Sequence, residues 1–178
     1  MKIIESKKNI QWRNFNLNTE TSAIVKEFDE ILSKESFAGL KKINKKLSLK
    51  NLTNLKVSKK EFKGSSKYLT DEEKFALYEA IKNISFVSKS QLNTLGRTIS
   101  PINGLNIWDK FVPISKVGLY VPGGTAPLIS SFLMQVIPAL TANCAEITVC
   151  TPPLKNGKVH PAILWLANQL NVSEIYKI

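Results

Sequence analysis

The fold is decided by residues 116–128, which read Lys116-Val117-Gly118-Leu119-Tyr120-Val121-Pro122-Gly123-Gly124-Thr125-Ala126-Pro127-Leu128. The first six residues are mostly β-branched, aliphatic or aromatic, which predicts a strand. The Pro-Gly-Gly-Thr run that follows predicts a tight turn. Apolar residues from 128 to 142 then predict a helix, bent at Pro138 because proline cannot donate to the helix ladder.

The same alternation continues downstream of this stretch. Residues 146–150 predict a second strand, Pro161 opens a second helix, and residues 174–178 predict a third strand. Strands that alternate with helices of this length indicate a parallel sheet with crossover helices. We therefore expect an α/β fold that contains the first βαβαβ part of an incomplete Rossmann-like sheet. We also expect the third strand to have an open edge, and the isolated chain to be poorly soluble or partly unfolded.

Upstream of residue 106 the sequence predicts mostly helices. An apolar stripe at helical spacing begins after Thr19, and Gly39 is expected to separate it from a second helix over 40–49. Residues 52–57 predict a short strand, and Ser58 with Glu61 has the spacing of a capping box. Thr70 and three acids begin a helix that is expected to reach Leu92.

The remaining connections and the domain limits follow from the same patterns. Asn103-Gly104 predicts a turn, and residues 107–114 predict a strand. We expect three parts in this order: an N-terminal arm over 1–18, a mostly helical region over 19–105, and the beginning of a Rossmann-like NAD-binding domain over 106–178.

The composition argues against a membrane, secreted or nucleic-acid-binding protein. The chain is 43% hydrophobic, enough for a core, and it has no apolar run of signal-peptide or membrane-span length, which predicts a soluble cytoplasmic protein. Its net charge of +11 is uneven: residues 1–97 carry 20 Lys+Arg and 11 Asp+Glu, a balance of +9. Only Arg13 and Arg97 are arginines, the residue that nucleic-acid sites favour. A solvated lysine surface is therefore preferred to a nucleic-acid patch.

The turn after the first strand is the candidate binding site. Gly123-Gly124 lets the backbone turn sharply and approach a ligand, and the helix that follows offers free N–H groups that suit phosphate. Tyr120, at the strand tip, can place its ring against a flat heterocycle. The same residues also fit a plain strand-to-helix turn with a half-buried tyrosine, and residue pattern alone leaves both readings open.

Residues 117–128 closely resemble the signature of the histidinol dehydrogenases. The resemblance continues through Ile137-Pro138-Ala139, Thr151-Pro152-Pro153 and Glu174-Ile175-Tyr176-Lys177, and extends more loosely to the helices near Thr19. It implies a cytoplasmic, homodimeric enzyme that uses NAD and zinc to oxidise L-histidinol to L-histidine through L-histidinaldehyde. Asn143 stands where the family has a glycine after the bent helix.

Within this chain the resemblance assigns one functional residue, Tyr120, as a contact to NAD. It assigns no catalytic residue and no metal ligand, because the zinc ligands and the acid–base pair of the family are expected beyond residue 178. The 178 residues alone are therefore predicted to be inactive. Two alternatives remain: a non-catalytic nucleotide- or partner-binding module, and a basic nucleic-acid-binding protein.

The other polar residues have simpler interpretations. His160 is the only histidine and is predicted to be a surface residue at a helix entry. Cys144 and Cys150 are expected to be small core residues, and Trp165 is expected to pack. The acids at 71–73 suit a helix N-terminus, and the lysines at 41, 42, 45 and 46 form a charged helix face.

Overall fold

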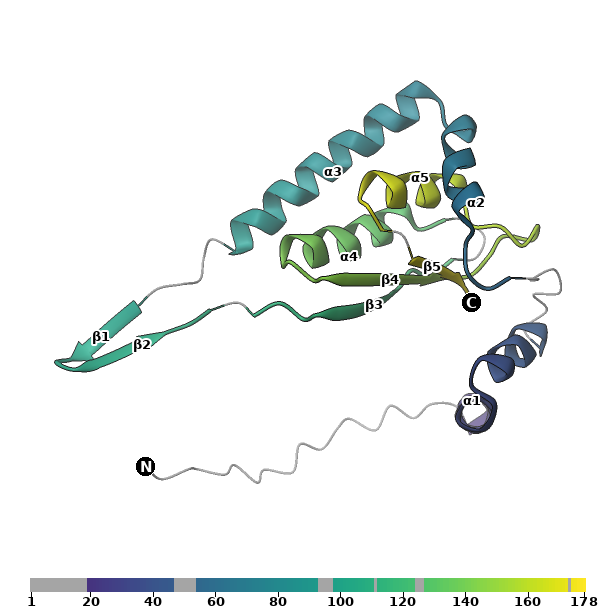
Figure 1. The fold of residues 1–178 in the computed structure, drawn as a ribbon, viewed down its shortest axis with the longest axis horizontal. Helices are drawn as coiled ribbons and strands as arrows, with labels where there is room; N and C mark the ends of the chain where they lie inside the picture. The colour runs from purple at the N-terminus through teal and green to yellow at the C-terminus, as the bar shows by residue number, and fades with distance from the viewer. Residues whose placement is uncertain (1–18, 47–53, 93–97, 111, 124–126, 173) are drawn as a thin grey trace. The chain divides into compact units, whose positions relative to one another are not determined.

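The computed structural model describes residues 19–46, 54–92, 98–110, 112–123, 127–172 and 174–178 (Figure 1). The expected N-terminal arm and the glycine–threonine part of the turn, residues 124–125, lie outside these ranges. The chain divides into two compact units, residues 1–47 and residues 48–178. No helix in the described ranges is long and apolar enough to cross a membrane.

The first unit contains one broken helix, α1 (Thr19–Lys46). The break lies at Ser36, where φ is 45° and ψ is −118°, and not at Gly39 as the sequence predicted. Gly39 is required for a different reason: a Cβ there would lie 2.7 Å from the carbonyl oxygen of Ile31, so only glycine allows this close approach. The second expected helix is thus the last part of α1, and residues 47–49 lie outside the described ranges.

The centre of the second unit is a parallel sheet of three strands in the order β3 (Lys116–Tyr120), β4 (Glu146–Thr151), β5 (Glu174–Lys177). The helices α4 (Ile129–Thr141) and α5 (Pro161–Gln169) make the two crossovers. This arrangement confirms the α/β fold and the βαβαβ order predicted from the sequence.

The outer edge of β5 is closed, which corrects the expected open edge. The Val57 N–H donates to the Ile175 carbonyl (2.9 Å), and the Lys177 N–H donates to the Leu55 carbonyl (2.7 Å). Residues 55–57 therefore run antiparallel along β5, as a single bridge between Lys56 and Tyr176 and not as a full strand. Sequence periodicity found the extended segment but not its partner.

Two short helices lead from this segment to the long α3 (Asp71–Leu92). They are α2 (Lys59–Gly64) and the 3-10 helix η1 (Ser65–Tyr68). The predicted capping box is confirmed, because the Ser58 N–H donates to Glu61 and the Glu61 N–H donates to the Ser58 hydroxyl (2.8 and 3.3 Å). Thr70 and Glu73 exchange the same pair of hydrogen bonds at the beginning of α3 (2.8 and 3.2 Å).

The core lies between the sheet and the helices on one of its faces (Figure 1). Burial of branched and aromatic side chains there drives the packing. The largest fully buried side chains include Phe132, Leu133, Val136, Val149, Leu166 and Ile175. Trp165 is also buried and meets the Tyr78 ring edge-on at 5.1 Å, so its predicted packing role is confirmed.

The helix α4 ends in a left-handed residue. Asn143 has φ 60°, a conformation that glycine and asparagine adopt more readily than other residues. The family glycine can therefore be replaced here without a change of backbone path.

A separate two-stranded hairpin precedes β3. It consists of β1 (Thr98–Ile102) and β2 (Leu105–Trp108), joined at the predicted Asn103-Gly104 turn, where Gly104 has φ 84°. The sequence placed one strand at 107–114; the structure has none over 112–114, and Trp108 ends β2. The first strand was missed because Pro101 argues against a strand.

Candidate functional site

The candidate site lies at the carboxyl ends of β3 and β4, where ligands bind in sheets of this kind. Tyr120 is the last residue of β3 and pairs in register with Cys150 of β4. Its side chain is 56% exposed, whereas Leu119 packs against the core and Val121 is fully buried. Tyr120 therefore presents its ring on the sheet face opposite the core, as a strand alternation requires.

The end of β3 is held from two sides. The Val121 N–H donates to the Cys150 carbonyl (2.8 Å), which continues the ladder past the strand. From α4, the Gln135 amide donates its Nε2–H to the Tyr120 carbonyl (3.1 Å). No local sequence pattern marks Gln135, because its partner is a main-chain oxygen 15 residues away.

The two loops that follow β3 and β4 approach each other at Gly123. A Cβ on Gly123 would lie 2.9 Å from Cγ of Pro152, closer than real side chains come. Glycine at this position therefore lets the first loop lie against the second. The predicted close approach of the backbone at Gly123 is therefore an approach to Pro152. Gly124 lies outside the described residues.

A small pocket separates these loops from the beginning of α5. Its volume of about 20 Å³ has room for about one water molecule. The lining residues come from both loops and from α5: Pro122, Gly123, Pro127, Thr151, Pro152, Pro153, Leu154, His160 and Ile163. Tyr120 is not among them, so the pocket and the tyrosine ring belong to different sides of the same strand end.

His160 caps α5 and lines this pocket. The Ala162 N–H donates to Nδ1 of His160 (3.2 Å), so the neutral ring carries its proton on Nε2. Burial lowers the pKa of the imidazole below its usual value, and the nearby Glu73 carboxylate opposes that shift. The predicted helix-entry role is confirmed, although the residue is partly buried and not on the surface.

The beginning of α4 is suited to an anion. Leu128 is its N-cap, and the Leu128 side chain makes no capping hydrogen bond to the first N–H groups. The N–H groups at a helix N-terminus, with the positive end of the helix dipole, suit phosphate. Together with the backbone approach at Gly123, this arrangement fits the phosphate-containing part of a dinucleotide such as NAD.

The described residues do not form a binding site for zinc. Among them, no three His, Cys, Asp or Glu side chains lie close enough to hold a metal ion. Cys144 and Cys150 are free thiols and only partly buried, so they are not the core residues that the sequence predicted. Burial raises the pKa of the Cys150 thiol, which makes it a weaker ligand and nucleophile.

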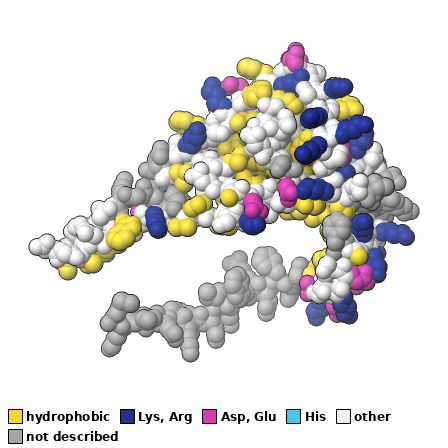
Figure 2. Space-filling view, in the orientation of Figure 1, with side chains coloured by type: hydrophobic (Ala, Val, Ile, Leu, Met, Phe, Trp, Pro, Cys, Tyr) yellow, Lys and Arg dark blue, Asp and Glu magenta, His cyan; other side chains and the backbone are white. Residues whose placement is uncertain are grey.

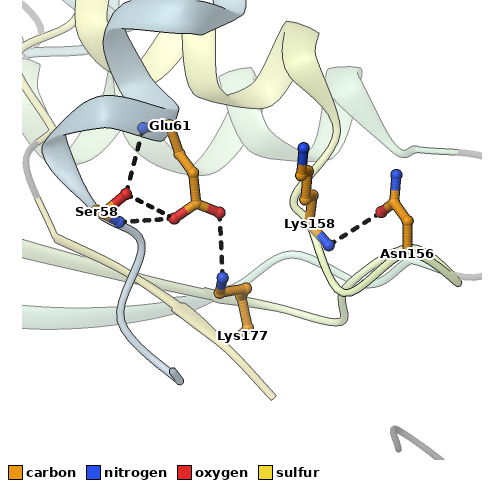
Figure 3. Close-up of polar contacts among 5 residues, drawn as sticks. All are labelled: Ser58, Glu61, Asn156, Lys158 and Lys177. Carbon is orange, nitrogen blue, oxygen red and sulfur yellow. Dashed lines mark hydrogen bonds and ion pairs between the residues drawn. The ribbon is translucent and has the colours of Figure 1, made fainter. Parts of the chain in front are cut away.

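A buried ion pair stabilises the end of β5. The Lys177 side chain is 8% exposed, and its Nζ lies 3.1 Å from Oε1 of Glu61 (Figure 3). Burial would raise the pKa of the Glu61 carboxyl, but the Ser58 N–H, the Lys177 ammonium and the Ser58 hydroxyl hold it below its ordinary value. Glu61 thus joins the cap of α2 to the last strand, a link that the sequence did not predict.

Comparisons with known proteins agree on one family. The family model described as histidinol dehydrogenase matches residues 12–178. A histidinol dehydrogenase from Bacteroides fragilis is 48% identical over 127 residues, which are 71% of this chain and 29% of the relative. One from Synechocystis is 35% identical and covers 88% of this chain and 36% of the relative.

A solved structure gives the same result in three dimensions. The crystal structure of histidinol dehydrogenase from Elizabethkingia anophelis matches with a TM-score of 0.81 and 37% identity, over 88% of this chain and 36% of that one. The chain spans about a third of the length of these relatives. With the family model matched over nearly all of its residues, the chain belongs to the histidinol dehydrogenase family.

Proposed function

We propose that this chain supplies one wall of the NAD site in an enzyme that oxidises L-histidinol to L-histidine through L-histidinaldehyde. In that reaction NAD would accept one hydride in each of two oxidations, and water would supply the second oxygen of the carboxylate. The observation that carries the proposal is the close approach of Gly123 to Pro152 at the carboxyl ends of the strands, in a chain of this family.

Three features of this chain act on the cofactor in the proposal. The exposed Tyr120 ring would stack against a flat ring of NAD. The N–H groups at the beginning of α4, which the Leu128 side chain does not cap, would face a phosphate. Gln135, which holds the Tyr120 carbonyl, positions the tyrosine without contact to the cofactor. NAD itself supplies the hydride acceptor.

The proposal places substrate oxidation outside the abilities of these 178 residues alone. The chain has a single histidine, and the described residues hold no metal-binding cluster, so no step through zinc is derived from them. We expect the chain to bind NAD without oxidising L-histidinol. A cytoplasmic homodimer that uses zinc is the proposed state of the whole enzyme.

Titration of the chain with NAD, followed by calorimetry, tests the proposal. Tyr120→Ala should weaken binding roughly two- to tenfold, because an aromatic stacking contact contributes about 0.5–1.5 kcal/mol. Tyr120→Phe keeps the ring and should retain the affinity. Tyr68→Ala removes an exposed tyrosine on η1 and serves as the matched control. Absence of NAD binding, or equal affinity in Tyr120→Ala, would contradict the proposal.

A further inference from the structure

Thr151 ends β4 with its side chain on the face of the sheet that the helices cover (Figure 1). Side chains alternate between the two faces of a strand, and in β4 the buried ones are Val149 and Thr151, whereas Cys150 between them is only partly buried. Thr151 is 2% exposed, although threonine is mostly found at protein surfaces. A hydroxyl this deeply buried is expected to have a hydrogen-bond partner.

The described residues offer the Thr151 hydroxyl no hydrogen-bond partner. The main-chain carbonyl of Thr151 accepts the Ile178 N–H (3.1 Å), but no described donor or acceptor is hydrogen-bonded to the hydroxyl. Leaving a buried hydroxyl unpaired costs free energy, because folding removes it from water without a replacement hydrogen bond. Enclosed water molecules commonly satisfy such groups.

Thr151 lines the small pocket between the loops that follow β3 and β4. The pocket has a volume of about 20 Å³, which is room for about one water molecule. Among the described buried residues, only Nδ2 of Asn44 is both without a partner and sealed from any space that water could occupy. The Thr151 hydroxyl is therefore in contact with such space, and the pocket supplies it.

The pocket brings further polar atoms to the same place. Of the lining residues that the structure describes, only Thr151 and His160 have side chains that form hydrogen bonds. Because Nδ1 of His160 accepts the Ala162 N–H, the neutral ring has its Nε2–H as a donor. The Pro152 carbonyl oxygen is a nearby acceptor, 3.7 Å from the position that a Cβ on Gly123 would take. An enclosed water needs two to four polar partners, and these groups provide them.

The size and the chemistry of the pocket select water as its occupant. The space is too small for a phosphate or an organic group, and none of its described lining residues is a carboxylate that could bind a hard metal ion. A water molecule both donates and accepts hydrogen bonds, so it can match a hydroxyl, an imidazole N–H and a carbonyl oxygen at once. The pocket thus has partners for one water molecule and room for nothing larger.

We propose that this pocket binds one ordered water molecule, which accepts a hydrogen bond from Nε2–H of His160 and donates one to the Thr151 hydroxyl oxygen. Thr151 ends β4 and His160 caps α5, so the water joins the two ends of the loop between these elements. Because Gly123 lies against Pro152 of that loop, the water also fixes the surface on which the loop after β3 rests. The inference concerns these two loops and does not depend on NAD binding.

Thr151→Val tests the water site by the sign of its effect on the melting temperature. Valine has nearly the shape of threonine without the hydroxyl, so in a dry pocket the change removes an unpaired polar group and should raise the Tm. With a water bound to the hydroxyl, the same change deprives the water of a partner and should lower the Tm by about 2–4 °C. Thr148→Val makes the same change on the opposite face of β4, where the side chain is only partly buried, and should shift the Tm by less than about 1 °C.

A crystal structure of the wild-type chain observes the water directly. It should show one ordered water roughly 2.7–3.0 Å from Oγ1 of Thr151 and within hydrogen-bond distance of Nε2 of His160. The same position should be empty of ordered water in Thr151→Val. A wild-type pocket without ordered water, or a Tm that Thr151→Val leaves unchanged or raises, would overturn the water site. Should Thr151→Val fail to fold, the wild-type crystal structure alone decides.

Discussion

The parallel sheet and the hairpin are both made of short strands rich in isoleucine, valine and leucine, yet their surroundings differ. Val149 and Ile175 of the sheet are fully buried under helices, whereas every residue of the hairpin strands is exposed. Strand-forming side chains therefore do not by themselves determine burial. In the sheet the stabilising partner lies within the second unit, whereas no described residue covers the hairpin strands, and hydrophobic side chains line one edge of the hairpin in Figure 2.

The two regions should differ most in how much free energy of unfolding is lost when a large side chain is replaced by alanine. Phe132→Ala removes a fully buried ring from α4 and should lower the free energy of unfolding by about 3–5 kcal/mol. Leu105→Ala in the hairpin should cost less than about 0.5 kcal/mol in a dilute, monomeric sample. Urea unfolding followed by circular dichroism measures both. Equal losses would mean that the hairpin is part of the core.

The ion pair at the end of β5 should give the next largest effect. Glu61→Gln leaves the buried Lys177 ammonium without its carboxylate and should cost about 1.5–3 kcal/mol at neutral pH. Because the folded-state pKa of Glu61 is lowered, its contribution is present above the ordinary carboxyl pKa and is lost as pH falls through the folded value. Unfolding curves between neutral and acidic pH should show this loss in the wild type and not in Glu61→Gln.

Alanine substitutions at Gly123 and Gly118 compare a crowded position with an open one in β3 and the loop that follows it. Gly123→Ala should cost about 1–3 kcal/mol, because its Cβ would press against Pro152. Gly118→Ala meets nothing within 4 Å and should be neutral or slightly stabilising. Thermal unfolding of the two variants measures the difference. A neutral Gly123→Ala would show that the two loops can separate freely.

The smallest effect is expected at the cap of α5. His160→Ala should cost about 1 kcal/mol at neutral pH, since it removes the acceptor for the Ala162 N–H. The folded-state pKa of His160 is lowered, so the stability of the cap is present above the ordinary histidine pKa and is lost as pH falls through the folded value. His160→Asn keeps an acceptor that does not titrate. Histidine side chains titrate roughly between pH 7 and 5. A free energy of unfolding that stays constant over this range in the wild type would contradict the role of His160.

The sequence predicted the elements that local patterns define. The strands near 116, 146 and 174 and the caps at Ser58 and Thr70 were found because each signal lies within a few residues. The break lies at Ser36 and not at the glycine that the sequence favours, because Gly39 is needed for close packing against Ile31. The strand β1 was missed because Pro101 obscured it, although the bulge tolerates proline.

The candidate site was predictable only in part. The pattern identified Gly123 as a backbone position, and the resemblance assigned Tyr120, whose contact with NAD stays a prediction. The contacts of Gln135 and the pairing of Glu61 with Lys177 join residues far apart in sequence, and no local periodicity records them. Within the candidate site, the contacts that the sequence did not predict are the ones between residues distant in the chain.

Residues 55–57 pair with the outer edge of β5, and the two segments are made at very different times during synthesis. Glu61 and Lys177 are 116 residues apart, and Lys56 and Glu174 are 118 apart, so the closing segment leaves the ribosome long before the strand it binds. Contacts between such distant residues form slowly, because the chain between them must first be ordered. Residues 55–57 therefore have no β5 to pair with until the end of the described chain has been made. Lys56 within this segment, and Lys59 and Lys60 just after it, place charge beside an edge that would otherwise be a site for association.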